Sequence, residues 1–181
     1  MLALDHIVRS GRALYAGISN YSPERAREAF AILRELKTPT VLHQVRYSMF
    51  VRDREQDGSF DVMKEFDVGG IIFSPMAQGL LTNRYLNGIP ADSRMTREAF
   101  LKSSVLTPET LEKIVKLNEL AQKRGQSLAS MAIAWVLRQD AVTSALIGAS
   151  RPAQIEDVLD GLDKNPAFTA EELAEIDAIL M

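Results

Sequence analysis

Short apolar runs alternate with longer amphipathic segments along this chain of 181 residues. Four of the runs each end in small polar residues, and they cover residues 13–18, 40–44, 70–73 and 143–147. Short apolar runs bounded by turn residues are typical of strands buried in a parallel sheet. All strands of such a sheet point the same way, so the polar residues that follow them gather at one edge, where α/β folds bind ligands. The pattern predicts an α/β fold with four parallel strands and helices.

The segments between and after these runs carry helix start signals. Ser22 followed by Pro23 is a favourable start, and Thr169 begins a capping box of the Thr-x-x-Glu type. Proline at position 75 ends the third strand, since it cannot continue a ladder. The polar connection over residues 82–106 is long and is expected to be either functional or mobile. We expect helices over residues 23–37, 59–66, 108–124 and 127–137, and from residues 152 and 170 onward.

Length and composition narrow the classes of function. A closed (β/α)8 barrel needs eight such units and roughly 250 residues, whereas four units are visible here, so we expect one domain over residues 1–181. The formal net charge of −3 offers no basic excess for a nucleic acid, and the absence of cysteine excludes disulfides and thiolate chemistry. Residues 1–11 do not resemble a signal peptide, and no apolar run is long enough to span a membrane. These features fit a cytoplasmic protein.

Polar side chains at the ends of the first two runs suit a planar amide ligand. Ser19, Asn20 and Gln44 offer a hydroxyl and two amides, which can donate to and accept from a group such as a nicotinamide carboxamide. The alternative is that Ser19 and Asn20 only make a turn before a helix. Phe73, at the end of the third run, is either a core residue or a stacking face for a flat heterocycle.

The stretch after the fourth run suits an anion. Gly148 allows close backbone approach, and Ser150 and Arg151 stand at a helix start. An ordinary turn with a solvated arginine explains the same residues. Arg84 and Arg94 add positive charge in the long connection. His6 and His43 are interpreted as structural, no metal-binding spacing is present, and no tyrosine has a lysine and an acid placed to activate it; the tyrosines are Tyr15, Tyr21, Tyr47 and Tyr85.

Several motifs in order along the chain resemble those of one enzyme family. They are residues 17–22 (GISNYS), Gln44 with Tyr47, residues 73–80 (FSPMAQGL), residues 85–90 (YLNGIP) and residues 147–151 (IGASR) with Gln154. Together they resemble the aldo-keto reductases, in the branch with potassium-channel β-subunit-like and glyceraldehyde-3-phosphate reductase-like members. The resemblance implies the carboxyl-terminal half of a (β/α)8 barrel and NADP(H) as the cofactor.

The resemblance also implies residue roles. Ser19, Asn20 and Gln44 would hold the nicotinamide carboxamide, and Phe73 would stack on its ring. The residues expected along the pyrophosphate and around the adenosine are Ser74, Met76, Gly79, Arg84, Arg94, Gly148, Ser150, Arg151, Gln154 and Asp157. Asn83-Arg84 stands where this branch usually has Gly-Lys, and Val158 replaces an asparagine that contacts adenine.

The family's catalytic Asp, Tyr, Lys and His belong to the first four βα units, which have no counterpart in this sequence. The resemblance therefore implies a truncated reductase of small carbonyl compounds that keeps the cofactor half and has no catalytic residue of its own. The alternative is a non-catalytic half-barrel module that pairs with itself, as a homodimer, or with a separate amino-terminal half. Two unpaired sheet edges and an inner face expected to carry Val41, Ile71, Ile72 and Leu146 would favour association.

Overall fold

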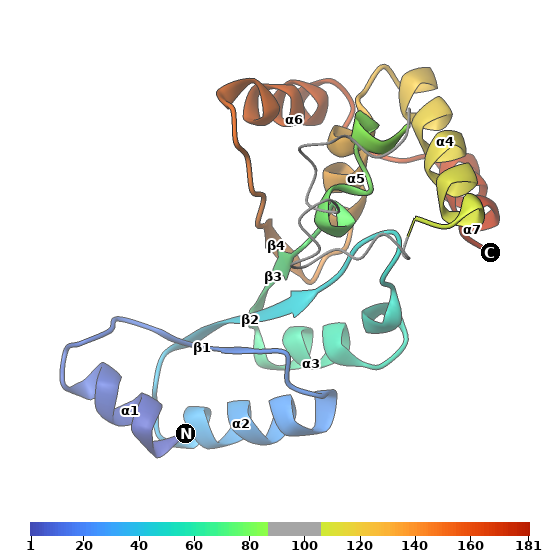
Figure 1. Ribbon diagram of the computed structural model, residues 1–181. Coiled ribbons are helices and arrows are strands. Elements are labelled where there is room, and N and C mark those ends of the chain that lie inside the picture. The colour runs from blue at the N-terminus through green and yellow to red at the C-terminus, as the bar shows by residue number, and fades with distance from the viewer. Residues whose placement is uncertain (87–105) are drawn as a thin grey trace.

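A four-stranded parallel sheet organises the molecule. The computed structural model describes residues 1–86 and 106–181, so Arg94, residues 87–90 of one motif and most of the long connection lie outside the described residues. The strands β1 (Ala16–Ser19), β2 (Thr40–Arg46), β3 (Gly69–Phe73) and β4 (Val142–Ala145) pair in the order β1-β2-β3-β4 (Figure 1). Every pairing is parallel. The expected α/β fold with four parallel strands is confirmed.

The helices begin where the capping signals place them. Ser22 Oγ accepts from the Arg25 N–H at 3.4 Å, and Thr107, Ser127 and Thr169 cap their helices in the same way. These caps use N–H groups that have no partner inside the helix. The helices that follow are α2 (Pro23–Glu35), α3 (Ser59–Phe66), α4 (Pro108–Lys123), α5 (Leu128–Leu137), α6 (Pro152–Lys164) and α7 (Ala170–Leu180).

A helix at the amino end, α1 (Leu2–Arg9), was not expected from the sequence. It has no buried residue, and polar contacts to distant residues hold it in place. The Asp5 carboxylate accepts from Arg9 Nε and from Thr38 Oγ1, each at 2.7 Å, and Arg9 Nη2 donates to the Leu36 carbonyl at 2.7 Å. Short 3₁₀ turns complete the described elements: η1 (Asp53–Glu55), η2 (Ala77–Gly79) and η3 (Asn83–Tyr85).

The buried side chains of the strands alternate, so one face of the sheet packs on helices. Ile18, Val45 and Ile72 lie on this face. One core cluster joins β1 to α2 and α3, and the other joins β2 and β3 to α4, α5 and α7. Figure 1 shows α2 and α3 beside β1 and β2, with α4 to α7 grouped at the other end of the sheet.

The opposite, inner face of the sheet is partly open. Leu146 is 45% exposed and Ile71 is half-buried, as expected for this face. Val41 is 41% exposed, but it lies two and four residues before His43 and Val45, which face the helices, so strand alternation does not place it on the inner face. The expectation for Ile72 was wrong, because Ile72 is 0% exposed and faces the helices. Neighbouring residues of a strand point to opposite faces, so Ile71 and Ile72 cannot share one. Within the described ranges, no helix has both the length and the apolar character to cross a membrane.

Candidate functional site

Ser19, Asn20 and Gln44 come together where β1 ends. Ser19 is aligned with Gln44 across the β1–β2 ladder, and the Asn20 N–H donates to the Gln44 carbonyl at 2.9 Å. Gln44 lies between His43 and Val45, which are buried against the helices, so its side chain is on the inner face. Asn20 has a φ of 57°, a left-handed conformation that asparagine tolerates better than most residues. The three residues predicted to hold an amide therefore form one corner of the sheet.

His43 supports this corner from behind the sheet. Its side chain is 0% exposed, and its Nε2 accepts from the Tyr21 N–H at 3.3 Å. Burial, assisted by the nearby positive charge of Arg54, lowers the pKa of His43 to about 4. The imidazole is therefore neutral near pH 7, in agreement with its interpretation as structural.

Phe73 ends β3 on the same face as Gln44. Gln44 is aligned with Ile71, two residues before Phe73, and Phe73 is half-buried. The turn that follows is unusual, because Ser74, Ala77 and Gln78 have φ values of 55°, 48° and 60° and Gly79 has 101°. Left-handed conformations cost a non-glycine residue about 1–2 kcal/mol each. Such strain gathers at functional sites, and nothing in the sequence predicts it, since alanine has no preference for this conformation.

A hydroxyl connects this turn to Arg84. Thr82 Oγ1 donates to the Gly79 carbonyl at 2.7 Å and accepts from the Arg84 N–H at 3.2 Å. Tyr85, which is 1% exposed, anchors the same segment in the core. Met76 is half-buried and packs against the core, whereas Arg84 is exposed. The predicted residues Gly79 and Arg84 are therefore held close together.

The segment after β4 is ordered by one side-chain oxygen. Gln154 Oε1 accepts from the Ser150 N–H at 2.8 Å, from the Ser150 hydroxyl at 3.3 Å and from the Arg151 N–H at 3.2 Å. Gly148, Ser150, Arg151 and Gln154 are all exposed. The start of α6 thus presents polar groups to solvent, and an anion there would compete with Gln154 for these donors.

Asp157 takes part in the contact between α5 and α6. Its Oδ2 accepts from Ser127 Oγ at 2.5 Å, and Gln126 Nε2 donates to the Gly161 carbonyl at 2.7 Å. Val158 is buried, and its carbonyl accepts from Ser130 Oγ at 3.3 Å. These contacts fix α6 on α5 and thereby fix the position of its exposed first turn.

Tyr47 has an acid beside it, Glu55, which lies eight residues further along the chain and which no motif in the sequence indicates as its partner. Its hydroxyl donates to the Glu55 carboxylate and accepts from Arg138 Nη1 at 2.9 Å. The phenol is 0% exposed, and burial raises its pKa further above the ordinary value. This arrangement ties Tyr47 to η1 through Glu55 and to the end of α5 through Arg138. Within the part of the chain that the structure describes, no three acidic or histidine side chains form a group able to hold a metal ion.

Comparisons with known proteins agree with this architecture. The model of the aldo/keto reductase family matches residues 1–181. The chain belongs to this family. It is 50% identical over 179 residues to L-glyceraldehyde 3-phosphate reductase of Escherichia coli (strain K12), and 49% identical to the protein of that name from Escherichia coli O157:H7. Both alignments cover 97% of this chain and 51% of the relative, in its carboxyl-terminal half.

A solved structure shows the same similarity in three dimensions. The glycerol dehydrogenase from Gluconobacter oxydans superposes with a TM-score of 0.74 at 28% identity, over 98% of this chain and 52% of that one. The chain therefore spans about half the length of the relatives that it matches. The resemblance to the aldo-keto reductases is confirmed, as is the half-barrel arrangement of four parallel strands and helices.

Proposed function

We propose that residues 1–181 form one partial domain, the NADP(H)-binding half of an enzyme that reduces small aldehydes or ketones to alcohols. The observation that carries this proposal is the corner formed by Ser19, Asn20 and Gln44, where the Asn20 N–H meets the Gln44 carbonyl at 2.9 Å. Family membership and two relatives named for reduction of L-glyceraldehyde 3-phosphate support the substrate class. In this proposal the chain takes part in carbonyl reduction only when it is combined with an amino-terminal half that carries the catalytic residues.

The corner fits a nicotinamide carboxamide by its chemistry. The ligand group has one acceptor oxygen and two N–H donors, and the hydroxyl of Ser19 with the amides of Asn20 and Gln44 supplies both kinds of partner. Phe73 shares the inner face with Gln44 and offers a ring for stacking. When bound, NADPH supplies a hydride. The residues of this chain bind the cofactor and orient it.

Two further segments fit the phosphates. The first is the left-handed turn over residues 74–79, where Thr82 holds the backbone of Arg84 beside Gly79, so that a positively charged residue follows the turn. The first turn of α6 presents Ser150, Arg151 and Gln154. Arg151 forks onto a phosphate in this proposal, so the 2′-phosphorylated dinucleotide is favoured. Asp157 acts through Ser127 by holding α6 in place.

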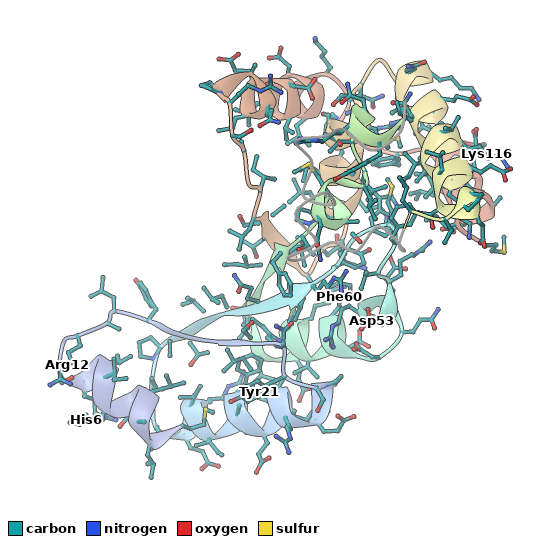
Figure 2. All side chains as sticks on the ribbon, in the orientation of Figure 1. His6, Arg12, Tyr21, Asp53, Phe60 and Lys116 are labelled. Atoms are coloured by element: carbon teal, nitrogen blue, oxygen red, sulfur yellow. The ribbon has the colours of Figure 1, made fainter. Side chains whose placement is uncertain are left out.

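Titration with NADPH and NADH tests the proposal. We expect the chain to bind NADPH more tightly than NADH, as followed by cofactor fluorescence and by calorimetry. Arg151→Ala should remove most of this preference. Arg12→Ala is the matched control, since Arg12 is exposed and precedes β1, at the end of the sheet opposite to the rim, near α1 in Figure 2. Equal affinity for NADPH and NADH in the unmodified chain, or an unchanged preference in Arg151→Ala, would contradict the proposal.

A second function, that of a binding or structural module, is supported by the open sheet. Leu14 and Tyr15, just before β1, are 79% and 60% exposed, and Leu146, just after β4, is 45% exposed. The order β1-β2-β3-β4 leaves β1 and β4 as sheet edges. Unpaired edges and exposed apolar side chains drive association. In this function the chain pairs with a second copy, rebuilding an eight-stranded barrel, or with a separate amino-terminal half.

A further inference from the structure

His43 and Gln44 are neighbours in β2 and both accept a hydrogen bond from the turn after β1, Gln44 through its backbone carbonyl and His43 through its side chain. The Asn20 N–H donates to the Gln44 carbonyl at 2.9 Å, and the next N–H, that of Tyr21, donates to His43 Nε2 at 3.3 Å. The two hydrogen bonds hold the chain just after Ser19. The Gln44 side chain points to the open inner face, whereas His43 is 0% exposed and lies edge-on to Phe30 at 6.0 Å between ring centroids.

The contact with Tyr21 determines the state of the imidazole. A nitrogen that accepts a hydrogen bond carries no proton, so in neutral His43 the proton is on Nδ1. Nδ1 is buried and finds no hydrogen-bond partner among the described residues. Burial holds the pKa of His43 at about 4, which keeps the acceptor available near neutral pH. In a protonated ring Nε2 would also carry a hydrogen, so it would face the Tyr21 N–H as a second donor and could not accept from it.

The turn after β1 needs hydrogen bonds to other parts of the chain to keep its conformation. Asn20 has a φ of 57°, a conformation that is less favourable than the extended one for an L-residue. The side chains of Ser19 and Asn20 are exposed, so their burial does not fix the backbone, whereas the ring of Tyr21 packs against the core cluster that contains Ile18 and Phe30. The hydrogen bonds to β2 add to this packing and tie the turn directly to the strand that carries Gln44.

We propose that His43 is a positioning residue for the amide-binding corner: by accepting the Tyr21 N–H, it fixes the turn that presents Ser19 and Asn20 next to Gln44. This proposal rests on the proposed function only for the identity of the ligand that the corner binds. The geometry of the turn can be tested without any cofactor.

Amide hydrogen exchange tests the turn directly. In His43→Leu the Tyr21 amide should exchange about five- to tenfold faster, the effect of losing one hydrogen bond of about 1 kcal/mol. His43→Gln, whose side-chain amide can reach a similar position, should restore most of the protection. His6→Leu is the control, because His6 is in the exposed helix α1 (Figure 2). Should His43→Leu not fold, ¹⁵N shifts of the ring in the unmodified chain must show Nε2 as the unprotonated nitrogen. Protonated Nε2, or equal Tyr21 exchange in all variants, would overturn the proposal.

Two ligands separate positioning from general damage. NADPH contains the nicotinamide, whereas 2′-phospho-ADP-ribose lacks it and retains the phosphates and adenosine. His43→Leu should weaken the binding of NADPH about tenfold more than the binding of 2′-phospho-ADP-ribose. His43→Gln should restore the ratio of the two affinities to that of the unmodified chain. An equal loss for both ligands would mean that His43 has only a structural role. If the unmodified chain binds neither ligand, the proposed function fails, and Tyr21 exchange alone decides whether His43 holds the turn.

Discussion

The guanidinium of Arg138 donates a 2.9 Å hydrogen bond to the hydroxyl of Tyr47, joining the end of α5 to the segment that follows β2. Arg138 also donates to Glu55 at 2.9 Å and lies 3.8 Å from the centre of the Trp135 ring. Glu55 accepts further from Arg52, which reaches Asp177 in α7. This network connects the segment after β2 with η1, α5 and α7; Tyr47 at its centre is 0% exposed, whereas the Asp177 side chain at its outer end is 52% exposed.

Tyr47→Phe should destabilise the fold by about 1–3 kcal/mol. Removing the hydroxyl takes one hydrogen-bond partner from each of the partly buried charged groups of Arg138 and Glu55, and hydrogen bonds to charged groups contribute about that much. Urea unfolding monitored by circular dichroism measures the change. Tyr15→Phe provides the comparison, since Tyr15 is 60% exposed and should keep the stability of the unmodified chain. Similar unfolding midpoints for Tyr47→Phe and Tyr15→Phe would show that the Tyr47 hydroxyl does not contribute to the free energy of unfolding.

Stability should fall as the pH is lowered from about 6.5 toward about 4 because of His43. Its pKa is about 4 in the folded chain, below the ordinary 6.5, so the unfolded state takes up the proton first and is favoured as the pH falls. The contribution is fully present above pH 6.5 and lost by about pH 4, with a total of up to about 3 kcal/mol. Arg54 and Asp57 are the charged groups that act on His43.

Comparison with His43→Gln isolates this effect, because the titration of carboxylates is common to both proteins. The difference in unfolding free energy between the unmodified chain and His43→Gln should narrow as the pH falls from 7 to 4.5. A constant difference between His43→Gln and the unmodified chain would assign the acid sensitivity to other groups.

Gly161→Ala should displace α6 from α5. A Cβ at this position would lie 1.8 Å from Ser130 Oγ and 2.6 Å from Ser130 Cβ. Overpacking of this kind costs about 1–3 kcal/mol or more. Ser130→Gly removes both atoms, so the double variant should recover part of the stability lost in Gly161→Ala. If the double variant loses as much stability as the two single variants together, residues 161 and 130 are not coupled, and the expected clash between α6 and α5 is absent.

The purified chain with NADPH should reduce small aldehydes at a negligible rate. A hydride donor without a placed acid lacks the roughly 10²- to 10⁴-fold that general acid catalysis supplies. Tyr47, the phenol with an adjacent acid, is buried and its pKa is raised. Loss of NADPH absorbance measures the rate, with heat-treated chain as the blank. Robust turnover by a homogeneous preparation would mean that the chain contains a proton donor that has not been identified.

The chain should associate at micromolar concentration through its open sheet. Light scattering is expected to give a mass above that of the monomer. Val41→Lys combined with Leu146→Lys should shift the mass toward the monomer, since both side chains are partly exposed beside the sheet. Leu2→Lys is the control on α1, where Leu2 is 73% exposed. A stable monomer in the unmodified chain would remove self-pairing as a function.

Local signals in the sequence predicted most of the elements. Ser22-Pro23, Thr107-Pro108 and the capping box at Thr169 each use atoms within a few residues, and the structure places a helix at each. Strand ends were less certain, because β1 begins at Ala16 and not at residue 13, and β4 ends at Ala145. α1 was missed, since its contacts are to Leu36 and Thr38, far along the chain.

By itself, the sequence determined where the four strands lie along the chain, most helix starts and which polar residues stand at strand ends, because these depend on near neighbours and on the period of the apolar residues. Only the tertiary structure decided which of Ile71 and Ile72 faces the helices, that Ala77 and Gln78 adopt left-handed conformations, and that His43 accepts from Tyr21. Each of these depends on groups brought together by folding. A side chain's neighbours in sequence do not encode the partner that burial and hydrogen bonding supply from another strand or helix.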